Sequence, residues 1–510
     1  MKKRISVLLA LLFILSLAAG CMGNVVDPNP GGSSPAGPGS TDGGGGSTDD
    51  PNGPPDPGRQ LPPMTEDHIT LTYATWDDIE MAEKLAEYFT KKYPNINVDV
   101  IWPGGTGTYM NALLTMAANG ELPDVWQSLE IATPINNGWY YDMTEFWNND
   151  PDTDLYLSSL HDSLTIDGRR VMQVVGEYLP EVAFLDRAVF RRLNVPMPDF
   201  NWTYEEMIQL IRDMTRPDQN IFGYNFMGGA GPITVAPIVL NDALSEFGWD
   251  GENYNLAGGW ADAVNLTAEF MQNGNQAIYG DETWLEASGG HAWPGDSGLI
   301  AMQLDAWWTY NNIYMKSGAI ERGIEMIPYV MPRGANASTN RKPAFLDYVS
   351  ISAGTKHPRE AYELLKWMSF CKEAWMTVRI PYFPLLTDDA GNRIYDVPNC
   401  FPLIDDDEVW NGFRGLFISA AEDEFKAAAL DAFMQLAREP VPLGSRGIPG
   451  FAQWLTEVYF ESEWNGVIGV EAAVFQGVLN AHDAVAELEE KGRQYYLEMM
   501  DVFYMVYGRP

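Results

Sequence analysis

The stretch ITLTYATWDDIEMAEKLAEYFTKKYPNINVDVIW, residues 69–102, decides the fold class. Apolar residues alternate with threonine over residues 69–73, as they do in a half-buried strand. Residues 79–93 then place alanine, leucine and phenylalanine on one helical stripe, and Pro94 ends the predicted helix. Residues 98–102 alternate again and predict a second strand.

The pattern continues outward from this stretch. Residues 109–119 predict a second helix, which Gly120 ends, and residues 123–125 open a third strand. Strands that alternate with helices in this way indicate an α/β fold with a mostly parallel sheet. Such sheets bind ligands beyond the carboxyl ends of their strands, so the segments that follow the three strands are expected on one rim.

The chain opens with a targeting signal. Lys2, Lys3 and Arg4 precede an apolar run over residues 5–19, which is typical of a signal peptide and short for a membrane span. The run ends in LAAGC, and small residues before Cys21 resemble the lipobox of bacterial lipoproteins. We therefore expect a signal peptide over residues 1–20 and a lipid on Cys21; secretion with cleavage nearby is the alternative.

A linker is expected over residues 21–63. Most of this segment is glycine, proline and serine without apolar periodicity, so it cannot bury enough surface to fold. It is expected to act as a tether between a membrane and the globular part of the protein. The predicted location is the extracellular face of the membrane, in a single-membrane, Gram-positive-type cell.

Composition excludes several classes of function. Among 510 residues, 70 are acidic and 32 are basic, giving a formal net charge of -38. A chain this acidic would repel the phosphate backbone, so nucleic acid is not an expected partner. Three cysteines argue against a disulfide-built scaffold, and five histidines leave little material for a histidine-rich metal site.

Short motifs in a fixed order carry a resemblance to a known family. They lie at residues 69–77, 119–125 (NGELPDV), 138–146, 202–206 (WTYEE), 300–307 (IAMQLDAW) and 353–366. In this order they resemble the extracellular solute-binding proteins of carbohydrate ABC importers, the family that contains maltose-binding protein. Residues 184–187 (FLDR) depart from the family's usual Y-N-K at that strand.

The resemblance implies a periplasmic-binding-protein-like type II fold, in which hinge crossovers join two α/β lobes. Mapping the motifs predicts one lobe from residues 64–176 with 304–346, and the other from residues 177–303 with 347–510. A sugar, most plausibly an oligosaccharide, would bind in the cleft, and the closed protein would deliver it to ABC permease subunits. A monomer without cofactor, metal or catalytic activity is expected.

The chemistry of sugar binding guides the choice of ligand residues. A sugar ring offers an apolar face to aromatic side chains and hydroxyl groups to carboxylates and amides. The chain has 17 tryptophans and 24 tyrosines, most of which should pack in cores. From strand ends and the resemblance, the expected ligand residues are Trp76, Asp77, Gln127, Ser128, Glu130, Glu177, Asn225, Asp305, Trp307, Trp308 and Tyr348, with Trp284 and Trp293 as weaker candidates.

Four of these candidates have a structural alternative. Core packing is the alternative for Trp307 and Trp308, and helix capping is the alternative for Asp77 and Asp305. Asp150, Asp152 and Asp154 have the spacing of the front of a calcium loop, but Leu155 stands where an EF-hand has glycine, which favours a solvated turn. A disulfide between Cys371 and Cys400 is left open.

Two other functions remain as alternatives at this stage. A secreted glycan-active enzyme would need a pair of carboxylates, which 70 acidic residues supply by chance, but no hydrolase motif such as G-x-S-x-G accompanies them. A structural or sensory lipoprotein would present a face to a partner without taking up a small molecule.

Overall fold

The computed structural model describes residues 58–76, 79–161, 164–226, 232–278, 282–290, 294–310, 314, 319, 321–334, 336–382, 385–387, 393–395, 401–418, 423–443 and 447–509. The predicted signal peptide, Cys21 and most of the predicted linker lie outside these residues. Within these ranges the chain has no helix whose length and apolar character suit a membrane span.

The first three strands form as their sequence pattern predicts. They are β1 (Ile69–Ala74), β2 (Ile96–Ile101) and β3 (Val125–Ser128), joined by α2 (Ile79–Lys92) and α3 (Thr106–Ala118). β1 lies between the other two strands and is parallel to both. The α/β class predicted from the sequence is therefore confirmed.

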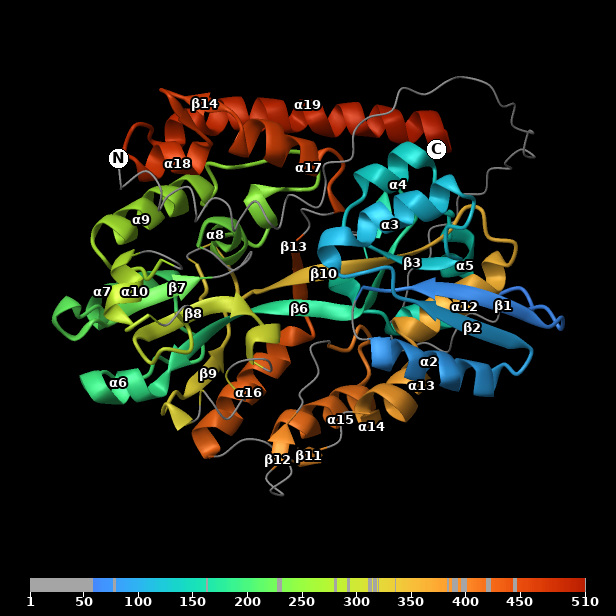
Figure 1. Cartoon of the computed structure of the whole chain (residues 1–510), viewed down its shortest axis with the longest axis horizontal. Helices are drawn as coiled ribbons and strands as arrows, with labels where there is room; N and C mark the ends of the chain where they lie inside the picture. Colours follow the sequence, from blue (N-terminus) through green and yellow to red (C-terminus); the bar gives the residue numbers. More distant parts are fainter. Residues whose placement is uncertain are drawn as a thin grey trace.

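One sheet runs through the whole molecule. Its order is β2-β1-β3-β10-β6-β8-β7, and β13 and β9 pair with β10 and β6. The strands not yet located are β6 (Gln173–Asp186), β7 (Phe222–Phe226), β8 (Ile300–Ala306), β9 (Met326–Tyr329), β10 (Lys342–Ile351) and β13 (Pro440–Leu443). β6 and β10 cross the middle of the molecule and join a first half, around β1–β3, to a second half, around β7–β9 (Figure 1).

The strand pairing differs from the predicted lobe boundaries. Residues 304–346 were expected in the first lobe, but β8 and β9 pair with the second half of β6, and β8 also pairs with β7. The return to the first half occurs along β10, which pairs with β3. The helix α12 (Pro358–Met368) then packs on α2, where the Trp367 indole donates to the Leu85 carbonyl at 2.9 Å.

Helices lie on both sides of the sheet (Figure 1). The remaining helical segments are α4 (Ala132–Asn137), α5 (Thr144–Asn149), η2 (Pro151–Leu155), η3 (Ser158–Leu160), α6 (Arg187–Leu193), α7 (Tyr204–Met214), η5 (Pro217–Gln219), α8 (Pro232–Leu240), η7 (Glu246–Gly248), α9 (Trp260–Gln272), α10 (Glu282–Ala287), α13 (Lys372–Ala374), η9 (Trp375–Arg379), α14 (Ile380–Tyr382), α15 (Asp407–Ile418), α16 (Glu424–Ala437), α17 (Phe451–Gln453), η11 (Trp454–Phe460), α18 (Val470–Phe475) and α19 (Ala481–Tyr507). Small hairpins are β4 (Thr165–Ile166) with β5 (Arg169–Arg170), β11 (Leu385–Thr387) with β12 (Arg393–Tyr395), and β14 (Glu463–Trp464) with β15 (Val467–Ile468).

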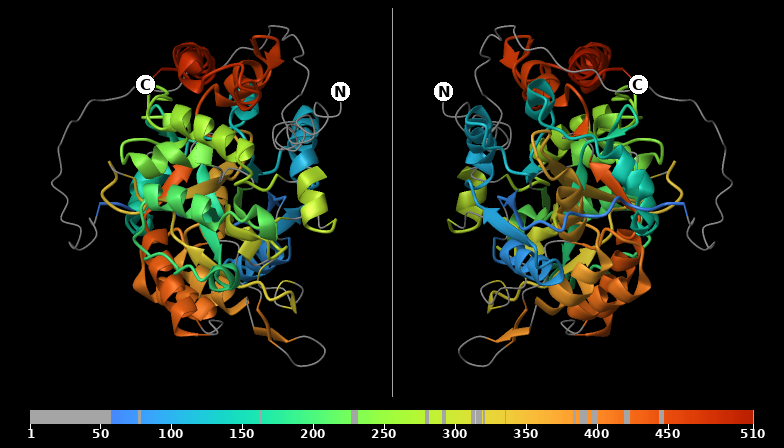
Figure 2. Two further views of the ribbon diagram at one scale, coloured as in Figure 1. Left: turned by 90° about the vertical axis from the view of Figure 1, so that its left-hand side faces the viewer. Right: turned by 90° about the vertical axis from the view of Figure 1, so that its right-hand side faces the viewer.

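The long helix α19 lies across one side of the molecule and contacts both halves (Figure 1; Figure 2). Leu488, in its first part, is buried in a core that α9 and η11 share. Phe503, in its last turns, is buried in the large core that contains β1–β3. The Tyr507 hydroxyl accepts a hydrogen bond of 3.2 Å from the backbone N–H of Tyr140, beyond the end of α4.

Candidate functional site

The ends of β1 and β3 are tied together by Gln127. Its side chain is buried, and its Oε1 accepts hydrogen bonds from the Thr75 hydroxyl at 2.9 Å and from the Trp76 backbone N–H at 3.1 Å. Its Nε2 donates to the Tyr73 hydroxyl at 3.3 Å. The predicted ligand residue Gln127 therefore holds the rim of the sheet in place through its own amide.

Ser128 and Glu130 continue this rim towards α4. The buried Ser128 hydroxyl donates to the backbone carbonyl of Glu130. The Glu130 carboxylate accepts from the Thr133 N–H at 3.0 Å and is also buried, which raises its pKa. Both side chains are engaged in local structure at the start of α4.

Two tryptophans stand at the carboxyl ends of β1 and β2. Trp76 is half-buried, with its ring edge-on to Tyr109 at 5.0 Å between centroids. Trp102 is 55% exposed, and its indole N–H donates to the Trp76 carbonyl at 3.3 Å. The sequence pattern placed Trp102 in a strand and did not indicate that its side chain lies at the surface. Asp77 lies outside the described residues.

The predicted ligand residues Asn225 and Asp305 lie in the second half of the molecule. Asn225 is buried in β7 and donates from Nδ2 to Gln303 Oε1 at 2.8 Å on β8. Asp305 is buried near the end of β8, and its Oδ1 accepts from the Ala306 N–H at 2.8 Å. Burial raises the pKa of Asp305 to about 7.

Glu181, on β6, is a buried acid that the sequence analysis did not select. Its side chain is wholly buried, and burial, followed by the charge of Asp305, raises its pKa well above the usual value. Burial lowers the pKa of Lys342, at the start of β10, well below the usual value. The signal in the sequence was a charged residue beside the apolar run Val182–Leu185.

The adjacent Trp307 and Trp308 lie in different environments. Trp307 is wholly buried and stacks on Phe433 at 5.0 Å, with Phe401 and Phe417 also against its ring. Trp307 therefore has the core-packing role that the sequence analysis gave as the alternative to sugar binding. Trp308 is only half-buried. The weaker candidates differ as well: Trp284 is buried against Phe222, and Trp293 lies outside the described residues.

The candidates at the ends of β1 and β3 form a first group, and those on β7 and β8 form a second group in the same sheet. Tyr348 is buried on β10, where its backbone pairs with Ser128 on β3 and with Val174 on β6. Glu177 belongs to β6, but its side chain lies outside the described part of the chain. The order β3-β10-β6-β8-β7 therefore links the first group to the second through the two crossing strands.

The three aspartates with the spacing of a calcium loop form ion pairs with basic side chains of the protein. Lys366 Nζ lies 3.0 Å from Asp150 and 2.7 Å from Asp152. Arg59 pairs with Asp154. The side chains of Asp152 and Asp154 are still more than half exposed, as expected of a solvated turn, and only Asp150 is buried. Cys371 is a buried free thiol, and Cys400 lies outside the described residues.

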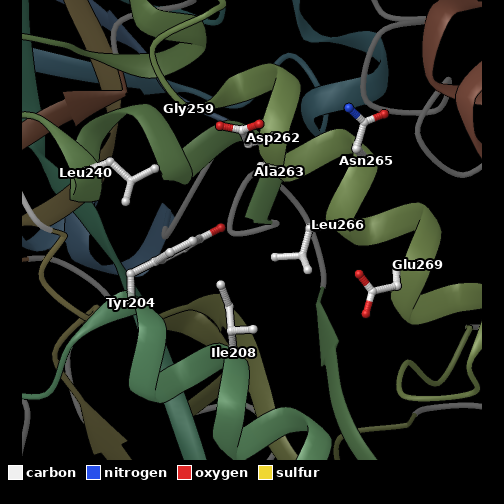
Figure 3. Close-up of a pocket in the computed structure, with 9 residues that line it drawn as sticks. All are labelled: Tyr204, Ile208, Leu240, Gly259, Asp262, Ala263, Asn265, Leu266 and Glu269. Carbon is white, nitrogen blue, oxygen red and sulfur yellow. The ribbon is translucent and has the colours of Figure 1, made fainter. Parts of the chain in front are cut away.

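A hollow of about 350 Å³ lies between α7, α8 and α9 (Figure 3). Apolar side chains such as Ile208 and Leu266 face it, and two carboxylates stand at its edge. Both are already paired, Asp262 with His482 and Glu269 with Arg212, each at 2.9 Å. The hollow contains none of the predicted ligand residues and does not belong to the rim at β1–β3.

Known proteins share this architecture. A family model described as bacterial extracellular solute-binding protein matches residues 75–370. No curated protein matches the chain. Among solved structures, a sugar transporter protein of Rhizobium etli in an open conformation is 14% identical, with a TM-score of 0.60, over 84% of this chain and 99% of its own.

Two further solved structures are similar at the level of the fold. An ABC substrate-binding protein of Listeria monocytogenes, in complex with cycloalternan, is 14% identical over 83% of this chain and 98% of its own, with a TM-score of 0.56. The sugar-binding protein MalE of Xanthomonas citri is 17% identical over 85% of this chain and 99% of its own, also with a TM-score of 0.56.

Proposed function

The chain belongs to the family of bacterial extracellular solute-binding proteins, and we propose that it captures an oligosaccharide between its two halves and delivers it to the permease of an ABC importer. The observation that carries this proposal is the pair of crossing strands, β6 and β10, which join two α/β halves. Strands of this kind are suited to hinge closure around a ligand.

Half-exposed indoles on both halves support a sugar as the ligand. Trp76 stands at the rim of the first half, and Trp308 follows β8 in the second. Within the adjacent pair we assign sugar stacking to Trp308, because Trp307 is enclosed by aromatic side chains. The Listeria and Xanthomonas proteins, one in complex with cycloalternan and one named as sugar-binding, are consistent with this ligand class.

The charge of the chain favours neutral sugars over acidic ones. A formal net charge of -38 creates a negative field that disfavours the approach of uronates or sugar phosphates. Neutral oligosaccharides of two or more rings would gain from stacking without this penalty.

Isothermal titration calorimetry with malto-, cello- and xylo-oligosaccharides tests the proposal. We expect one series to bind and to shrink the radius of gyration in small-angle scattering as the halves close. If no sugar in the three series bound and the scattering curve never changed, the proposed function would be wrong.

Adjacent substitutions separate stacking from core packing. Trp308→Ala should weaken sugar binding by roughly tenfold or more, with little effect on melting temperature. Trp307→Phe, its matched control, should lower the melting temperature because it leaves a cavity in the aromatic core, while affinity stays within about threefold. If Trp307→Phe weakened sugar binding and Trp308→Ala did not, the stacking role would instead belong to Trp307.

We also propose that Cys21 bears the lipid that anchors the protein outside the cell. The basic residues, apolar run and small residues before Cys21 support this assignment. Radiolabelled palmitate should enter the wild-type protein and not Cys21→Ala, which should appear in the medium. Label in the variant would contradict the assignment.

Binding and closure without covalent chemistry complete the proposal. The family is one of solute-binding proteins. We expect no new reducing ends after prolonged incubation with any sugar that binds. Steady release of reducing ends by the purified protein would favour the glycan-active enzyme instead.

A further inference from the structure

Trp102 is held in an exposed position by a defined contact. It is 55% exposed and is the one tryptophan that the described part of the chain leaves largely in solvent. Its indole N–H donates to the Trp76 carbonyl at 3.3 Å. That bond limits rotation of the ring, so one indole surface is presented to solvent in a fixed place.

The support behind Trp102 is rigid. Ile101, the residue before it, pairs with Ala74 in the parallel β1–β2 ladder. Trp76 rests edge-on against Tyr109, whose buried hydroxyl donates to the Ala74 carbonyl at 3.0 Å. Trp102 and Trp76 thus form an aromatic ledge, anchored in the core by Tyr109.

Two glycines that follow Trp102 in the chain have open space around them. A side-chain carbon built at Gly105 or at Gly107 would meet no atom within 4 Å. Gly105, just before α3, and Gly107, in its first turn, are therefore small residues with free space beside them, and both follow Trp102 closely in the chain. The ledge also lies beyond the carboxyl ends of parallel strands, which is where sheets of this kind bind ligands.

We propose that Trp102 forms an outer subsite, which stacks on an additional ring of an oligosaccharide bound between the halves. This inference rests on the proposed function and adds to it a preference for longer chains. A flat indole suits the apolar face of a pyranose ring and needs no charge to bind it. Trp76, which is less exposed, would contact the ring next along the chain.

The test compares sugars of increasing length within one series. Calorimetry would measure dissociation constants for the malto-, cello- and xylo-oligosaccharide series, from disaccharide to hexasaccharide, with the wild type, Trp102→Ala and Trp102→Phe. Leu497→Ala is the matched control, because Leu497 is 50% exposed but lies on α19. Melting temperatures of all variants would verify folding.

We expect Trp102→Ala to weaken the longer sugars by about tenfold and the shortest bound sugar by less than about twofold. Trp102→Phe should retain most of the affinity, and Leu497→Ala should match the wild type at every length. Equal affinities for the wild type and Trp102→Ala at all lengths, or the same loss at every length, would overturn the outer subsite and leave the proposed function standing. If the wild type bound no sugar, both would fail.

Discussion

At Lys366, one ammonium group is held between carboxylates inside the first half of the molecule. Its side chain is 8% exposed and that of Asp150 is 1% exposed. Burial opposes the charge of Lys366, but the carboxylates of Glu363 and Asp150 outweigh it and raise the pKa of the lysine. The Tyr362 hydroxyl donates to the same Asp150 carboxylate at 3.2 Å.

Lys366→Met should destabilise the protein by about 3–5 kcal/mol, because it leaves Asp150 buried without its cation. Urea unfolding at neutral pH would measure the change. Lys84→Met is the control, since Lys84 pairs with Glu87 on the exposed face of α2 and should have almost no effect. An unchanged unfolding midpoint for Lys366→Met would show that this ion pair does not stabilise the fold.

Asp305 makes stability depend on pH. Its pKa is raised by burial to about 7, whereas an unfolded aspartate titrates near 4. Between these values the native state holds the proton that the unfolded state has lost, so the contribution of Asp305 to stability falls as the pH rises. A shift of about three units corresponds to roughly 4 kcal/mol.

Asp305→Asn should remove this dependence, because the amide keeps the acceptor oxygen for the Ala306 N–H and cannot ionise. Relative to wild type, the variant should gain stability at pH 8 and only about a third as much at pH 5, as measured by urea unfolding at both. Asp99→Asn, on the exposed side of β2, is the control. Parallel pH profiles for wild type and Asp305→Asn would contradict the raised pKa.

The sequence could not predict the environments of the candidate ligand residues. It selected both Trp307 and Trp308, but only long-range packing against Phe401, Phe417 and Phe433 decides which indole is enclosed. The partner of Asp150 lies 216 residues away in the chain, so no local pattern could reveal that ion pair.

Among the elements, α7 shows how one of the family-like motifs works locally. The WTYEE stretch begins this helix with a capping box: the Thr203 hydroxyl accepts from the Glu206 N–H, and the Glu206 carboxylate accepts from the Thr203 N–H at 2.7 Å. The preceding Trp202 is buried and donates to the Val330 carbonyl at 2.8 Å. This motif therefore fixes the start of a helix.

Thr203→Ala should cost about 1 kcal/mol in the free energy of unfolding, because it removes the acceptor at the start of α7. Thr115→Ala, on the exposed surface of α3, is the matched control and should be neutral or slightly stabilising, since alanine is the better helix former. Thermal unfolding of both variants measures the difference. Equal effects would mean that the capping box contributes nothing.

Local periodicity predicted β1, β2 and the helices that follow them, because each of these elements has a more buried and a more exposed side, whereas β3 is buried along its whole length and was predicted from residues 123–125. It could not place the crossovers. β8 is buried along its whole length between β6 and β7, so its apolar residues fit a strand in either half. The pairing of β8 and β9 with β6 is a long-range choice that a single sequence does not display.

At the scale of the whole molecule, α19 links parts that are distant in the chain. Its first part packs with α9 and η11, and its last turns pack near α4. Its two faces differ, because Phe503 is wholly buried whereas Met505 is 77% exposed. Most of the stabilisation at this end should therefore come from one side of the helix.

Phe503→Ala should destabilise the protein by about 3–5 kcal/mol through the cavity it leaves in the large core. Met505→Ala, two residues away, should change stability by less than about 0.5 kcal/mol. Urea unfolding of the two variants, followed by tryptophan fluorescence, gives the comparison. A loss no larger for Phe503→Ala than for Met505→Ala would show that the end of α19 is not packed as described.

The helix α19 packs against both halves and therefore restrains their motion relative to each other. If the crossing strands were the sole connection, the gap between the halves could widen until the strands themselves resisted. Because α19 packs against α9 in its first part and near α4 in its last turns, any wider opening of the halves would have to loosen one of these contacts. Under the proposed function, this helix would limit the size of the sugar that can enter, although none of the predicted ligand residues lies on it.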